Sequence, residues 1–222
     1  MIVVPYLQFR PRIGADLDAA LDAAVIGRAQ IGARCHLGQL ATVRADGEDI
    51  HIGDDCWFAD FSTVHIAHSV FPAVVGDGVT VANFGLVHAC FLGDGCVVGE
   101  HALVMDNSRI GAYAVIAADS VVSPGKVLEG GWLYAGIPAK AVRAISQQEV
   151  ATLHALLRGQ VPTGDPTLAA VVRSAAPLPP LTQKPGEGLP SKLNAGAYIA
   201  PTASVNGNLS LASGASIWFG VE

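Results

Sequence analysis

Two of the seven histidines stand in matching positions and could hold a metal ion together. Each of Arg44, His65 and His88 directly follows a valine. Neutral imidazole is a good ligand for zinc, iron or cobalt. Neighbouring strands of a parallel ladder lie about 4.8 Å apart, so two such rings could share one cation if the fold stacks them. Chance placement of two surface histidines is the competing interpretation.

A repeat of six residues would provide that stacking. From Ile13 onward an aliphatic residue opens each unit and a small residue usually stands four places later, as in IGADLD, VIGRAQ, IGARCH, IGDDCW, VGDGVT and LGDGCV. Three units make one triangular coil, with Gly, Asp or Asn in the turns, where positive φ costs little. A doubly wound α/β fold would need amphipathic helices between the strands, and this region has none. The repeat predicts a mainly β fold, a parallel β-helix over residues 1–145.

The phase of the repeat assigns polar side chains to faces. The valines before Arg44, His65 and His88 open units on one face of successive coils, so these three side chains form one outward column. On a second face the equivalent outward column consists of Asp60, Asn83 and Glu100. We therefore expect two polar columns that run along different faces of the same β-helix.

Three stretches of the chain match one known family. They are VRAD at 43–46, ADFSTVHIAH at 59–68 and PGKVLEGGWLYAGIPAKAVR at 124–143. The region from Ile31 to Ile145, about half of the chain, resembles the γ-class carbonic anhydrases and their bacterial relatives within the hexapeptide-repeat superfamily. The resemblance implies that the coils wind left-handed.

The resemblance also implies a metal, Zn or else Fe or Co, held between the subunits of a homotrimer. His65 and His88 would come from one subunit and position 83 from its neighbour. The family has histidine at position 83, whereas this chain has Asn83, whose amide oxygen is a weaker zinc ligand than imidazole nitrogen. His68 and Glu100 are candidate replacement ligands.

The implied reaction is the hydration of CO2 to bicarbonate by hydroxide that the metal generates from water. The resemblance implies that Arg44 and Asp46 pair across subunits. Asp60 matches the family pattern and joins these two residues as the candidate catalytic group.

Composition limits the other possibilities. The chain has 222 residues, a formal net charge of −6 and 51% hydrophobic residues, which is not the composition of a disordered protein or of a nucleic-acid-binding one. No apolar run approaches the roughly 20 residues of a membrane span, and MIVVPYLQFRPR does not resemble a signal peptide. We therefore expect a cytoplasmic protein without nucleic-acid or membrane partners. All four cysteines are expected to be reduced, and three of them, Cys35, Cys56 and Cys96, fall at the small inward position of their hexads, whereas Cys90 lies in a short five-residue unit.

The repeat is interrupted after Ile145. Ser146 and Glu149 form a predicted capping box, which begins a helix over residues 146–158. Residues 159–192 are rich in proline and are predicted to be a linker. Hexads return at 193–222, in the register of residues 13–42, and resemble the start of a second copy. We expect them to stack on the open end of a β-helix.

Two further functions fit the same fold. Hexapeptide-repeat proteins include acyltransferases that depend on coenzyme A, in which a histidine acts as general base, here His36 or His68. The third possibility is a non-catalytic trimeric scaffold or assembly protein, which the substitution at Asn83 favours.

Overall fold

The computed structural model describes residues 1–161 and 166–174, together with four short strands at 192–193, 198–199, 210–211 and 216–217. The chain forms two units, 1–175 and 176–222, and each is described by itself. Among the described residues, no helix has the length and apolar character needed to cross a bilayer.

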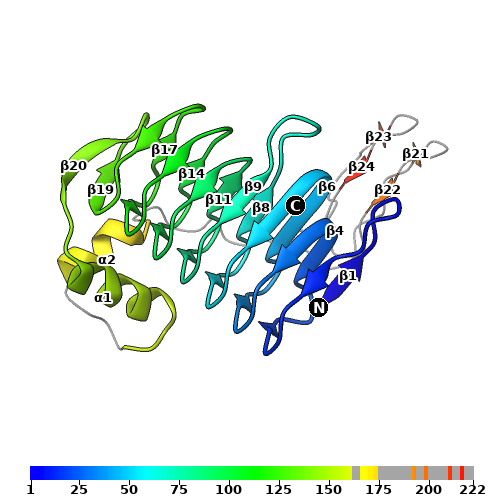
Figure 1. The fold of residues 1–222 in the computed structure, drawn as a ribbon, viewed down its shortest axis with the longest axis horizontal. Coiled ribbons are helices and arrows are strands. Elements are labelled where there is room, and N and C mark those ends of the chain that lie inside the picture. Colours follow the sequence, from blue (N-terminus) through cyan, green and yellow to red (C-terminus); the bar gives the residue numbers. More distant parts are fainter. Residues whose placement is uncertain (162–165, 175–191, 194–197, 200–209, 212–215, 218–222) are drawn as a thin grey trace. The chain divides into compact units, whose positions relative to one another are not determined.

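The first unit is a left-handed parallel β-helix with three faces, as predicted (Figure 1). Face 1 contains β1 (Ile2–Val4), the first halves of β4 (Ala24–Ile31) and β6 (Thr42–Ile52), β8 (Thr63–His65), β11 (Leu86–His88), β14 (Leu103–Val104) and β17 (Val121–Val122). Face 2 contains β2 (Arg12–Ile13), the second halves of β4 and β6, β9 (Ala73–Val75), β12 (Phe91–Leu92), β15 (Arg109–Ile110) and β18 (Val127–Leu128). Face 3 contains β3 (Asp18–Ala19), β5 (His36–Leu37), β7 (Trp57–Phe58), β10 (Thr80–Val81), β13 (Val97–Val98), β16 (Val115–Ile116) and β19 (Trp132–Ala135), which pairs with the antiparallel β20 (Lys140–Ala144).

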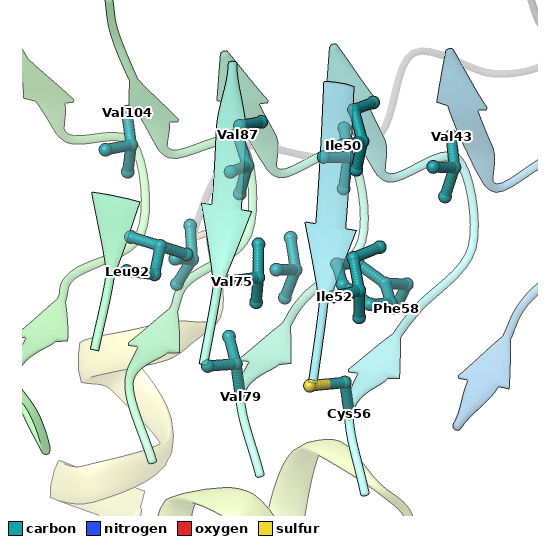
Figure 2. Close-up of a cluster of buried hydrophobic side chains, with 14 of the residues drawn as sticks. Val43, Ile50, Ile52, Cys56, Phe58, Val75, Val79, Val87, Leu92 and Val104 are labelled. Atoms are coloured by element: carbon teal, nitrogen blue, oxygen red, sulfur yellow. The ribbon is translucent and has the colours of Figure 1, made fainter. Parts of the chain in front are cut away.

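The first residue of each hexad fills the interior of the coils. Val43, Val64 and Val87 stand in register on face 1, and each is at most 1% exposed. Figure 2 shows how such side chains stack in layers, with Val43 and Val87 above and Cys56 and Val79 below. Because these layers consist of buried apolar side chains, the hydrophobic effect over them is the main stabilisation of the fold.

All four cysteines are buried in this interior, as the phase of the repeat predicts for three of them. Burial raises the pKa of both Cys90 and Cys96 to about 12, so these thiols stay protonated near neutral pH. A protonated, buried thiol acts as a small apolar side chain.

The turns depart from the expected glycine and asparagine chemistry at several corners. Phe61 and Phe84 have φ values of 60° and 59°, and His101 follows with 56°. Left-handed backbone costs such residues on the order of 1 kcal/mol each. Their rings stack at 4.7 Å and 4.9 Å between centroids, so the aromatic contacts between coils offset part of that cost.

The helix predicted after residue 145 is present as α1 (Gln147–Leu157), with Ser146 as N-cap and a complete capping box with Glu149. A second helix, α2 (Pro166–Val172), lies inside the segment predicted to be a linker. Proline suits the first position of a helix, and Val172 is fully buried against the cluster that α1 forms with face 3. Figure 1 shows the two helices side by side beneath the coils.

The second unit repeats the pairing of the first coil. β21 (Lys192–Leu193) pairs in parallel with β23 (Ser210–Leu211), and β22 (Tyr198–Ile199) pairs with β24 (Ser216–Ile217). The partners Lys192 and Ser210 are 18 residues apart, as are Arg12 and Gln30 at the start of the chain. This register agrees with a second copy of the opening coil. The predicted stacking of 193–222 on a β-helix end lies outside the described residues.

Candidate metal centre

The predicted polar column is present on face 1. Arg44 lies in register with His65 on the next coil, and His65 lies in register with His88 on the coil after that. The two imidazole rings meet nearly edge to face, with their centroids 5.0 Å apart. The periodicity of the valines therefore placed both histidines correctly.

A chain of four side chains runs through this column. His65 Nε2 lies 3.0 Å from Asp46 Oδ1, and His88 Nδ1 lies 2.5 Å from Asp106 Oδ1. Between the two rings, His88 Nε2 lies 3.1 Å from His65 Nδ1. Each histidine thus presents one nitrogen to a carboxylate and the other nitrogen to its neighbour.

The two ring nitrogens that face each other, His65 Nδ1 and His88 Nε2, have no proton to share if both rings are neutral. An ionised carboxylate only accepts hydrogen bonds, so His65 Nε2 and His88 Nδ1 must carry the N–H groups. If both rings are neutral, His65 Nδ1 and His88 Nε2 then point lone pairs at each other. A cation between them, either a shared proton or a metal ion, would remove that repulsion.

The donor set fits half of a zinc-type site. Two nitrogens that each lie about 2.0–2.1 Å from one tetrahedral ion are about 3.3 Å apart, close to the 3.1 Å found here. A carboxylate on the far nitrogen of each ring is the usual support of a metal-ligating histidine. Among the described residues, no group of three or more His, Cys, Asp or Glu side chains could hold a metal. A metal here would therefore need a further donor.

Arg44 and Asp46 contribute charge beside the rings. Arg44 Nε lies 3.6 Å from Asp46 Oδ2, and Arg44 Nη2 lies 3.4 Å from His65 Nδ1. Burial acts to raise the pKa of Asp46, but the hydrogen bond from His65 and the charge of Arg44 outweigh it and hold that pKa below its ordinary value. Asp46 therefore stays an acceptor. The Arg44–Asp46 contact lies within one chain, and its formation across subunits stays a prediction.

Asn83 is not part of this cluster within one chain. It lies in the turn between β10 on face 3 and β11 on face 1, whereas His88 ends β11. The turn at Asn83 opens face 1 and His88 closes it, so the two residues stand at opposite corners of that face. That position 83 serves the site of a neighbouring subunit stays a prediction.

The other candidate residues of the second column have structural contacts. Asp60 Oδ1 accepts a hydrogen bond of 2.8 Å from the backbone N–H of Gln39 on the preceding coil. Glu100 Oε2 accepts one of 2.9 Å from the backbone N–H of Ser174, just after α2. His68 lies exposed in the loop between β8 and β9. These contacts tie Glu100 to α2 rather than to the histidines.

The sequence analysis missed Asp106 as the partner of His88. Val104 pairs with Val87, so Met105 is the next member of the Arg44 column. Asp106 follows Met105 and lies at the adjacent corner. An acidic residue directly after a column position was the feature of the sequence that could have indicated this contact. It also missed the contacts of His154 with Thr80 Oγ1 at 2.7 Å and with the Gly95 carbonyl at 3.1 Å, which fasten α1 to face 3.

Comparison with known proteins agrees with the fold. No family model matches the chain. It is 30% identical over 145 residues to γ carbonic anhydrase 2 of Arabidopsis thaliana mitochondria, and covers 52% of that protein with 63% of its own length. It is 29% identical to protein YrdA of Escherichia coli, and covers 86% of it with 68% of its own length. A hexapeptide transferase family protein from Anaplasma phagocytophilum is 30% identical with a TM-score of 0.65, over 72% of this chain and 98% of that one.

The fold and the stacked column define a hexapeptide-repeat β-helix protein. The chain belongs to the hexapeptide transferase family, and within that family it is similar to the γ carbonic anhydrases of Arabidopsis thaliana and to protein YrdA. It spans about half the length of the Arabidopsis proteins that it matches.

Proposed function

We propose that this protein is a metal-dependent, carbonic anhydrase-like enzyme that converts CO2 and water to bicarbonate and a proton. The observation that carries the proposal is the pair of facing nitrogens, His65 Nδ1 and His88 Nε2, 3.1 Å apart and each backed by a carboxylate. A bound divalent ion such as zinc would lower the pKa of water towards 7 and so supply hydroxide for attack on CO2.

The residues of the chain would prepare this site in separate ways. Asp46 and Asp106 accept the outer N–H groups of the rings and so fix the tautomers in which the inner nitrogens can bind a metal. Arg44 holds Asp46 in its charged form and adds positive charge beside His65. Positive charge near the rings would favour bicarbonate and weaken the binding of a cation.

Asn83 of a neighbouring subunit would complete the site in a homotrimer with three equivalent interfaces. An amide oxygen binds zinc more weakly than an imidazole nitrogen does, so we expect weaker metal binding than a three-histidine site would give. Harder divalent ions such as Fe²⁺ tolerate an oxygen ligand better, which makes iron as reasonable a metal as zinc.

The variant Asn83→His tests this assignment. It should bind zinc at least about tenfold more tightly than the native chain and hydrate CO2 faster in a stopped-flow pH-indicator assay. Gln39→His is the matched control, because Gln39 occupies the same outward column two coils earlier. If Asn83→His gains no more than Gln39→His, position 83 does not face the metal, and the scaffold function becomes the better explanation.

One observation favours an acyltransferase as the second candidate. His36 Nδ1 lies 2.8 Å from Asp18 Oδ2, and the His36 ring stacks on Trp57 at 3.6 Å. A histidine oriented by a carboxylate has the arrangement of a general base. Release of free coenzyme A from acetyl-CoA in the presence of amine or hydroxyl acceptors, lost in His36→Gln, would support this function over CO2 hydration.

A further inference from the structure

A cavity lies on face 2, at the N-terminal end of the β-helix. Its volume is about 260 Å³, and its walls include Phe9, Arg10, Arg12, Arg28, Asp49 and His51. The histidine pair of the candidate metal centre is on face 1, so this cavity is a separate site. Three arginines converge here in a chain whose formal net charge is −6.

One wall of the cavity is an outward column of the β-helix. Arg12 pairs in register with Gln30 on β4, and Gln30 pairs with His51 on β6. Their side chains therefore stand about 4.8 Å apart along face 2. The column gives a rigid row of hydrogen-bond donors.

Two further lining residues, Phe9 and Arg10, come from the segment that precedes β2. Tyr6 and Phe9 exchange two backbone hydrogen bonds of 2.9 Å and 3.0 Å, which close a tight turn. Pro11 is buried between Arg10 and Arg12 and restricts the backbone there. The segment that carries both arginines is thus held in place before any ligand binds.

Arg28 is already satisfied by the protein. Its Nε donates to Asp49 Oδ1 at 3.0 Å, its Nη1 donates to the Gly47 carbonyl at 3.0 Å, and its guanidinium lies 4.4 Å from the Phe9 ring centroid. The register between β4 and β6 shifts between Gly27 and Ala29, so Arg28 stands at an irregularity of the ladder. Asp49 therefore neutralises Arg28.

Arg10 and Arg12 differ from Arg28 in having no such acid. In the part of the chain that the structure describes, neither side chain forms a hydrogen bond or an ion pair. The cavity therefore holds two guanidinium groups in excess of its carboxylate. Guanidinium groups bind phosphate and carboxylate oxygens through paired hydrogen bonds.

We propose that this cavity binds a small oxyanion, phosphate or carboxylate, through Arg10 and Arg12. The volume lies just below the roughly 300–1,000 Å³ of sites for drug-sized molecules, so it suits a free anion, a small phosphate ester or a short carboxylic acid. The donors of Gln30 and His51 line the same space and add hydrogen bonds to a multiply charged ligand.

Titration of the metal-free protein with inorganic phosphate tests the proposal, with the heat of binding measured by calorimetry at constant ionic strength and pH 7. A parallel titration with malonate separates a phosphate site from a carboxylate site. We expect saturable binding of one anion per cavity. The double variant Arg10→Gln/Arg12→Gln should weaken that binding by at least about tenfold, because it removes both charge-assisted donors.

Arg109→Gln is the matched control. Arg109 lies in the same face 2 column as Arg12, five coils further along, and its guanidinium rests 4.1 Å from the Phe91 ring. Equal binding by the double variant and the native protein would overturn the proposal, as would an equal loss in Arg109→Gln or no saturable binding of either anion. Circular dichroism of each variant checks the fold. Metal-free protein keeps this outcome independent of the metal centre.

Discussion

Replacing Asp106 by Asn tests whether the hydrogen-bond chain prepares His88 to bind a metal. The carboxylate lies 2.5 Å from His88 Nδ1, and its side chain is 33% exposed. Loss of a supporting partner of this kind typically weakens metal binding 10- to 100-fold, or about 1.4–2.7 kcal/mol. Because solvent screens part of the charge, we expect the lower end, about tenfold.

Competition with a chromophoric zinc chelator at pH 7.5 measures the affinity directly. Asp18→Asn is the matched control, since Asp18 makes the same kind of contact with His36 outside the site. We expect its zinc affinity to equal that of the native protein. A change of less than about twofold in Asp106→Asn, or an equal change in Asp18→Asn, would refute the role assigned to the hydrogen-bond chain.

Three further predictions concern the scaffold. Burial, together with the charge of Arg158, lowers the pKa of His154 from 6.5 to about 4, so below pH 6.5 the unfolded chain takes up a proton that the folded protein does not. The free energy of unfolding, measured with urea, should therefore be about 2 kcal/mol lower at pH 5 than at pH 7.5. The variant His154→Gln should lack that loss, and a variant as sensitive to acid as the native protein would contradict the assignment. Ser146→Ala removes the N-cap of α1 and should cost about 1 kcal/mol in the same assay, whereas no loss would mean that the capping box is not needed. Phe58→Ala empties a site that is 1% exposed and should cost about 3–5 kcal/mol; a loss below about 1 kcal/mol would show that the coils collapse around the cavity.

The repeat made most of the fold predictable. Inward residues at fixed spacing determine the register of a β-helix, so the positions of Val43, Val64 and Val87 determine where Arg44, His65 and His88 lie. Each coil contacts only its neighbours. The six-residue periodicity was therefore enough to predict both the β-helix and the column of Arg44, His65 and His88.

The repeat did not predict the side-chain contacts between coils or the residues at the corners. The contact of Asp106 with His88 depends on a side chain that crosses from a turn, and hexad phase does not specify its rotamer. Helix α2 was hidden in a proline-rich segment, because its stability comes from packing Val172 against α1 rather than from its seven residues alone. Bulky Phe61 and Phe84 occupy turn positions where small residues are the rule, because each ring is supported by stacking from its neighbour.

Elemental analysis of the purified protein after incubation with zinc or iron and removal of excess ion tests the metal centre most directly. The account predicts close to one metal ion per chain, and a His65→Ala/His88→Ala variant that retains its fold but not the metal. Less than about 0.1 metal ion per chain in the native protein, or full retention in the double variant, would contradict the assignment of the facing nitrogens as metal ligands.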